Sequence, residues 1–92
     1  MHGPPVAAHT RPVTASRSGR VAAIDNRRLA RVAKLAGAPE AKAAGVELHQ
    51  WLGNPVEAGE PLFTVHAETP GELAYALDYV AANPDMLRLD SD

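Results

Sequence analysis

The side chains able to do chemistry in this 92-residue chain are four histidines and a small group of carboxylates. His2 and His9 lie near the amino terminus, whereas His49 and His66 fall on segments that read as neighbouring strands. A catalytic zinc ion needs three protein ligands held close together. The spacing fixes no third ligand beside His49 and His66, so we expect ordinary strand histidines and no metal site.

Three glutamates offer a second kind of chemistry. Glu47, Glu57 and Glu60 cluster near glycine turns, where paired carboxylates could act as general acid and base. Charged side chains at turns are more often a solvated rim, and we favour that interpretation. The sequence also contains no glycine-rich phosphate loop, dinucleotide fingerprint or nucleophile elbow. We therefore predict no catalytic and no cofactor-binding residue.

A row of basic residues could hold a phosphate group: Arg27, Arg28, Arg31 and Lys34. An anion site would more naturally use the amino end of a helix fed by a glycine-rich loop. The stretch Ser16-Arg17-Ser18-Gly19 has one glycine and lies well before that end. We expect a solvated helix face that is available to touch another domain.

Composition narrows the classes of protein that remain. A formal net charge of −2 provides no basic field for nucleic acid or an anionic membrane. The absence of cysteine excludes a disulfide framework and a thiol nucleophile, and is typical of a reducing compartment. No apolar run approaches the ~18 residues that cross a bilayer, and the start lacks the layout of a secretory signal. We expect a soluble, cytoplasmic protein.

The predicted strands and helices begin after a proline-rich start. Residues 1–12 hold three of the eight prolines and predict a flexible linker or tail, with residues 13–92 forming one domain. Residues 13–24 predict a single strand that is bulged or kinked at Gly19. Asp25 and Asn26 then start an amphipathic helix, which Gly37 and Pro39 end.

Residues 45–66 read as strand, glycine turn, short strand, glycine turn and strand, which predicts a compact β-module with two close hairpin connections. The stretch Thr69-Pro70-Gly71-Glu72 predicts a second helix, which Asn83-Pro84 stops, and residues 86–89 predict an edge strand. The fold class is thus α+β, a small antiparallel or mixed sheet module with two flanking helices. The glycines assigned to structural turns are Gly19, Gly37, Gly45, Gly53 and Gly59.

The order of several short motifs resembles the carboxy-terminal domain of pyrimidine-nucleoside and thymidine phosphorylases, over about Val13 to Ala82. The fold that the resemblance implies is of the α/β-hammerhead, barrel-sandwich-like type. The matching motifs are Thr14-Ala15, Ser18-Gly19-Arg20-Val21, Ile24-Asp25-Asn26, Ala36-Gly37-Ala38-Pro39, Lys42-Ala43-Ala44-Gly45-Val46-Glu47-Leu48, Leu52-Gly53, Val56 and Gly59-Glu60-Pro61-Leu62-Phe63-Thr64-Val65-His66-Ala67-Glu68.

The resemblance implies a non-catalytic domain of an enzyme that cleaves a nucleoside with phosphate, giving a free base and a pentose 1-phosphate. In that family the phosphate-gripping segment and the contacts to the base belong to upstream domains, so no catalytic residue is carried onto this chain. The implied partners are those upstream domains, with nucleoside and phosphate bound there. The intact enzyme would be a homo-oligomeric pentosyltransferase of nucleoside salvage that needs no cofactor besides its co-substrate phosphate.

Two questions stay open at this point. Gly37-Ala38-Pro39-Glu40 and the short link to Gly45 look like the longer branch of the family, which includes nucleoside-monophosphate phosphorylases, so thymidine and AMP-type substrates both remain. The stretch from Gly53 to Leu62 also resembles the turn of biotinyl and lipoyl carrier domains. Those carriers need a lysine on an exposed turn, whereas this chain has only Lys34 and Lys42. A free-standing protein-interaction module is the third alternative.

Overall fold

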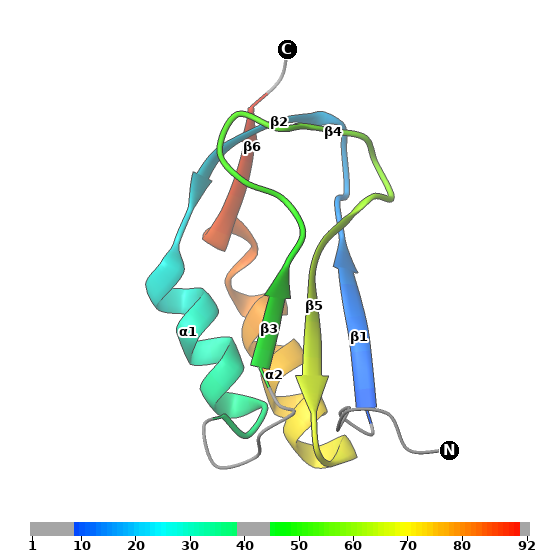
Figure 1. Cartoon of the computed structure of the whole chain (residues 1–92), viewed down its shortest axis with the longest axis vertical. Helices are drawn as coiled ribbons and strands as arrows, with labels where there is room; N and C mark the ends of the chain where they lie inside the picture. The colour runs from blue at the N-terminus through cyan, green and yellow to red at the C-terminus, as the bar shows by residue number, and fades with distance from the viewer. Residues whose placement is uncertain (1–8, 39–44, 91–92) are drawn as a thin grey trace, which may run out of the picture.

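The computed structural model describes residues 9–38 and 45–90, which form two small antiparallel sheets and two helices (Figure 1). The strand order is β1-β5-β3 in the first sheet and β4-β2-β6 in the second. The α+β class, the antiparallel pairing and the two flanking helices are confirmed. The elements are β1 (His9–Thr14), β2 (Gly19–Ile24), α1 (Asn26–Leu35), β3 (Gly45–Leu48), β4 (Pro55–Val56), β5 (Pro61–Ala67), α2 (Pro70–Ala82), the short 3-10 helix η1 (Pro84–Met86) and β6 (Leu87–Asp90).

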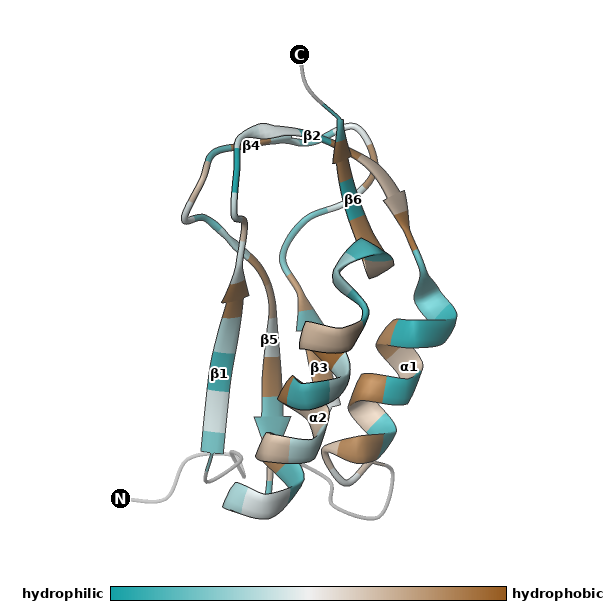
Figure 2. Ribbon diagram, turned by 180° about the vertical axis from the view of Figure 1, so that it is seen from behind, coloured by the Kyte–Doolittle hydropathy of each residue, from teal (hydrophilic) through white to brown (hydrophobic). Residues whose placement is uncertain are grey.

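Strand β5 is the centre of the first sheet, and its alternation separates a buried face from an open one. Phe63, Val65 and Ala67 are buried, whereas Thr64 and His66 between them are half-buried. Because side chains alternate across a strand, the first set points toward the helices and the second points away from them. Figure 2 shows both helices lying against the back of this sheet.

Both helices begin where the sequence predicts. Asp25 caps α1, its side chain accepting a hydrogen bond from the backbone N–H of Arg28 at 3.1 Å. Thr69 caps α2 in the same way, accepting from the backbone N–H of Glu72 at 3.1 Å. These caps satisfy backbone donors that the first turn of a helix leaves unpaired. Asn83 ends α2, and β6 is the predicted edge strand of the second sheet.

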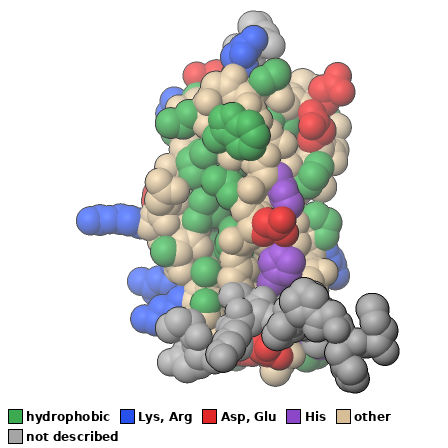
Figure 3. All heavy atoms as spheres, in the orientation of Figure 1, with side chains coloured by type: hydrophobic (Ala, Val, Ile, Leu, Met, Phe, Trp, Pro, Cys, Tyr) green, Lys and Arg blue, Asp and Glu red, His purple; other side chains and the backbone are tan. Residues whose placement is uncertain are grey.

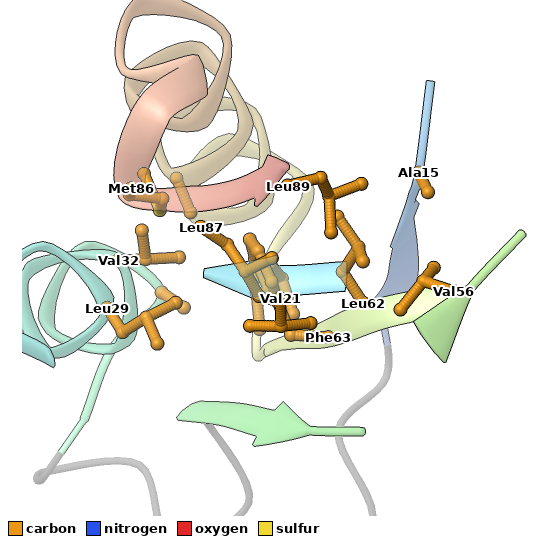
Figure 4. Packing of buried hydrophobic residues seen from close by; sticks show 14 residues of the cluster. Ala15, Val21, Leu29, Val32, Val56, Leu62, Phe63, Met86, Leu87 and Leu89 are labelled. Atoms are coloured by element: carbon orange, nitrogen blue, oxygen red, sulfur yellow. The ribbon is translucent and has the colours of Figure 1, made fainter. Parts of the chain in front are cut away.

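The hydrophobic core joins the two sheets to the helices (Figure 4). Phe63, Val65 and Val32 are its largest fully buried side chains. The second sheet adds Val21 from β2 and Leu89 from β6, which pair directly across their strands. Such packing at apolar side chains supplies most of the free energy that holds a domain of this size together.

The prediction of one kinked strand over residues 13–24 was wrong. Strands β1 and β2 belong to different sheets, and residues 15–18 carry the chain from one to the other. Ala15 makes this crossing by exchanging backbone hydrogen bonds with the turn before β5: its N–H donates to Glu60 and its carbonyl accepts from Gly59, both at 2.8 Å. Propensity alone shows two β-forming stretches but not that they pair with different partners.

The start of the first strand also differs from the expectation. Strand β1 begins at His9, so residues 9–12 of the expected tail are paired with β5 instead. Thr10 lies opposite His66 and Pro12 lies opposite Thr64. Pro12 is tolerated because β1 is an edge strand, where a missing backbone N–H costs little. The rest of that expected tail lies outside the described residues.

The two predicted hairpins were wrong as well. Strand β3 pairs with β5, and β4 between them pairs with β2 of the other sheet. The chain therefore leaves the first sheet after Leu48, visits the second sheet at Pro55–Val56 and returns to the first at Pro61. The connection 49–60 is a link between two sheets.

Candidate functional site

Four polar side chains gather on the open face of the first sheet. His66 Nε2 donates to Glu47 Oε1 at 3.2 Å, and His49 Nε2 shares a hydrogen bond of 2.7 Å with Thr64 Oγ1. Their closeness follows from the pairing of β3 with β5, which places Glu47 directly opposite Thr64. Figure 3 shows histidine and acidic side chains in a column on this face. His66 lies on β5 as expected, whereas His49 directly follows β3 and is not on a strand, and the two histidines hold different partners.

This polar cluster does not line the cleft found in the described part of the chain. A hydroxyl bonded to an imidazole, as in Thr64 and His49, is the arrangement of a nucleophile and its base. A working pair also needs a group that orients the base and a cavity for the substrate. None of the four side chains lines the cleft between the first sheet, α2 and β6. Across residues 9–38 and 45–90, no group of three or more His, Asp or Glu could hold a metal ion.

A cleft of about 450 Å³ lies between the first sheet, the end of α2 and β6. Its apolar walls include Phe63, Val80 and Met86, and its polar rim includes Arg17 and Arg88. The Arg17 guanidinium donates to the backbone carbonyl of Leu89, which holds it on β6. The sequence reasoning missed this cleft because its walls come from segments far apart in the chain. No residue that we singled out for catalysis contributes to it.

The other two glutamates serve a turn. The backbone N–H of Glu57 donates to Glu60 Oε1 at 2.7 Å, and Glu57 itself is exposed. A carboxylate that accepts from the backbone in this way orders the loop. Their position at a turn agrees with the expectation of a solvated rim. The structure does not bring the Glu57 and Glu60 side chains together as an acid and base pair.

Four of the five turn glycines have the positive φ that other residues rarely adopt: Gly37, Gly45, Gly53 and Gly59. Gly53 shows why this matters, because its φ of 87° lets its N–H donate to Val21 of β2 at 2.9 Å. Gly19 is different, since it has no positive φ and is paired with Val56 in the second sheet. A side-chain carbon at Gly19 would lie 2.5 Å from the carbonyl oxygen of Asp90, so only glycine fits between β2 and β6.

Among the basic residues of α1, Arg28 has a structural role. Its guanidinium pairs with Asp25 at 3.1 Å and also with Asp85 of η1, which ties the start of α1 to the segment before β6. The hydrogen bond from Arg28 holds the pKa of Asp85 below its usual value, and the same bond raises the pKa of Arg28. Arg27, Arg31 and Lys34 are exposed, in agreement with a solvated helix face.

One surface feature was not singled out from the sequence. Large apolar side chains are exposed at Leu48 (41%), Trp51 (64%) and Leu52 (64%), and separately at Tyr75 (69%) on α2. The signal available was that Trp51 is the single tryptophan of the chain and stands beside Leu52. Neither α1 nor α2 has the length and apolar character needed to cross a lipid bilayer.

Comparison with known proteins gives consistent matches along the chain. The family model described as "Pyrimidine nucleoside phosphorylase C-terminal domain" matches residues 20–86. A protein of Polaromonas sp. (strain JS666 / ATCC BAA-500) is 62% identical over 92 residues, which is 100% of this chain and 18% of the relative. A protein of Sphingopyxis alaskensis is 61% identical over 89 residues, which is 97% of this chain and 17% of the relative.

A more distant match from Legionella pneumophila (strain Corby) is 54% identical over 80 residues, or 87% of this chain and 16% of the relative. All three relatives carry the name "Putative thymidine phosphorylase". The chain therefore spans less than a fifth of the length of the curated relatives that it matches.

Proposed function

Since the chain belongs to the family of pyrimidine nucleoside phosphorylase C-terminal domains, we propose that it is the non-catalytic C-terminal domain of a thymidine phosphorylase. Such an enzyme is a pentosyltransferase that uses phosphate to release a free base and a pentose 1-phosphate from a nucleoside. The observation that carries the proposal is the 62% identity across the whole chain to less than a fifth of a protein with that name.

The chemistry of the described side chains supports a structural role. His66, Glu47, His49 and Thr64 are paired with one another on an open sheet face, away from the cleft. Arg28 joins two elements of the fold. The reacting groups would then belong to the upstream part of the polypeptide, where nucleoside and phosphate bind. No cofactor, nucleic acid or membrane enters this proposal, and the intact enzyme is a cytoplasmic homo-oligomer.

The domain's contribution is mechanical. Its sheets and helices pack beside the phosphate-binding part of the enzyme and help to fix its orientation as the cleft closes over the substrate. A small α+β domain with a single core is suited to this, because its sheets and helices pack against the same buried residues.

Thymidine is the favoured substrate, with AMP-type nucleotides as the alternative. The names of the relatives support thymidine. The sequence feature that pointed to the longer branch, Pro39-Glu40 and the short link, lies outside the described residues. A carrier function has less support, because Lys34 lies on α1 and is not on a turn. Lys42 also falls outside the described part.

Deletion of residues 13–92 from the full-length polypeptide tests the proposal. We expect kcat/KM for thymidine to fall by about tenfold or more, together with a lower melting temperature, because the cleft loses its support. Circular dichroism of the truncated protein checks that the remainder is folded. Unchanged rate and unchanged stability would show that the domain does not support the catalytic cleft.

A further inference from the structure

We propose that the domain docks onto the upstream part of its own polypeptide through an apolar patch formed by Trp51 and Leu52, here called the docking patch. This inference rests on the proposed function, because it names the surface through which the support would act. Trp51 and Leu52 each expose 64% of their surface. Buried tryptophans contribute disproportionately to binding, so a freely exposed one beside a leucine marks a contact surface.

The loop that carries the docking patch is held in place by hydrogen bonds. The loop is hydrogen-bonded to the backbone of β2 at Val21. The Val21 N–H donates to the Asn54 carbonyl at 3.0 Å, and the Val21 carbonyl accepts from the Gly53 N–H at 2.9 Å. Beneath it, buried Gln50 donates to the Pro61 carbonyl at 3.0 Å and accepts from the Asn54 side chain at 2.8 Å. The loop is therefore ordered before binding, which lowers the entropy lost on docking.

The docking patch lies on the side of the molecule that the domain's own helices leave uncovered. Helices α1 and α2 cover the back of the first sheet, whereas the loop follows β3 on its open side (Figures 1 and 2). Figure 3 shows hydrophobic side chains gathered on this open face, above the column of histidine and acidic side chains. Tyr75 is equally exposed but lies alone on α2.

The size of the patch argues for an occupant that is covalently tethered. Two side chains are far fewer than the roughly 20 to 30 residues, or about 800 Å² per partner, that an independent interface uses. A segment of the same polypeptide is held near the docking patch at an effective concentration of about millimolar, so a small contact area is enough for docking. The relatives provide such a neighbour, because more than four-fifths of their length lies outside the matched region of this C-terminal domain family.

Hydroxyl-radical footprinting of the full-length polypeptide tests the docking patch, with Tyr75 as the internal reference. After correction for intrinsic reactivity, we expect oxidation of Trp51 to be at least about fivefold slower than that of Tyr75, because a docked tryptophan is desolvated. In the separate domain Trp51 and Tyr75 are similarly exposed and should be oxidised at equal corrected rates. Equal rates in the full-length polypeptide would therefore overturn the proposal. Slow oxidation that becomes fast on dilution would also overturn it, because the occupant would then be a second copy of the chain.

A pair of matched variants provides the second measurement. In the full-length polypeptide, Trp51→Ser should increase the rate of limited proteolysis between this domain and the upstream part by about tenfold, whereas Tyr75→Ser should not change it. Equal proteolysis of both variants and the unsubstituted protein contradicts docking through Trp51. The deletion test and the docking tests can give different answers. If deletion abolishes activity while Trp51 stays exposed in the full-length polypeptide, the support function stands and this docking surface is wrong.

Discussion

At the scale of single residues, Gly19 determines how closely β2 and β6 approach each other. We predict that Gly19→Ala destabilises the domain by about 1–3 kcal/mol, because the new carbon would lie 2.5 Å from the Asp90 carbonyl oxygen and the strands must separate. Urea denaturation followed by circular dichroism measures the change. Gly71→Ala is the matched control, since nothing lies within 4 Å of its added carbon on α2, and it should be neutral or slightly stabilising. Equal effects of the two substitutions would contradict this explanation.

The ion pair of Arg28 with Asp85 predicts a pH dependence. The pKa of Asp85 is lowered in the folded state by the hydrogen bond from Arg28, relative to an ordinary value of 3.8. A depressed folded pKa gives stability that is present above 3.8 and is lost as the pH falls through the lower, folded value. Asp85→Asn should therefore reduce the denaturation midpoint at pH 7 but not at a pH below both values. A constant difference between the two proteins at every pH would contradict the pairing.

The same residues show what the sequence can and cannot predict at this scale. The capping roles of Asp25 and Thr69 were predictable, because a cap bonds to a backbone group three residues away. The pairing of Arg28 with Asp85 was not, because the two are 57 residues apart and meet only when β6 is placed beside β2.

At the scale of elements, α2 depends on its capping box. Thr69 accepts from the backbone of Glu72 and its hydroxyl donates to the Glu72 carboxylate, both at 3.1 Å. Thr69→Ala should cost about 1 kcal/mol of unfolding free energy, since the backbone N–H loses its acceptor. Thermal unfolding measures the loss, and Thr69→Ser, which keeps the hydroxyl, should recover most of it. If serine is as destabilising as alanine, the hydroxyl is not what stabilises the helix start.

The elements themselves were largely predictable, whereas their pairing was not. Both helices appear with the expected starts because their caps and apolar periodicity are local signals. The strand segments were also recognised, yet β4 pairs with β2 and β3 pairs with β5. The glycine turns around Pro55 look the same in sequence whether they close hairpins or link two sheets, since the hydrogen-bond partners lie elsewhere in the chain.

At the scale of the whole molecule, one aromatic side chain holds the layers together. Phe63 is 1% exposed at the centre of the first sheet, and Phe63→Ala should cost about 3–5 kcal/mol. A domain of this size has a total stability of about 5–15 kcal/mol, so the variant should lose a large part of it. Thermal unfolding in the full-length polypeptide checks this, with exposed Tyr75→Ala as the control. A melting temperature equal to that of the control would contradict the central role of Phe63.

The candidate site could be predicted only in part from the sequence, and the reason lies in how the whole chain folds. Sequence motifs indicated correctly which family the chain resembles, because the family model matches residues 20–86. The cleft and the docking patch were not foreseen. The walls of the cleft come from segments far apart in the chain. The docking patch comes from one short segment, and its position depends on the backbone hydrogen bonds between β2 and the loop that carries Trp51.

Under the proposed function, this domain supports a catalytic cleft without supplying a reacting group. The most direct measurement is kcat/KM for thymidine phosphorolysis by the full-length polypeptide carrying Glu47→Gln, His49→Gln or His66→Gln. We predict values within about threefold of the unsubstituted enzyme, because no proton transfer to substrate is lost. A fall of about a hundredfold or more in any of the three, with the folded state retained by circular dichroism, would show that a side chain of this domain takes part in the reaction.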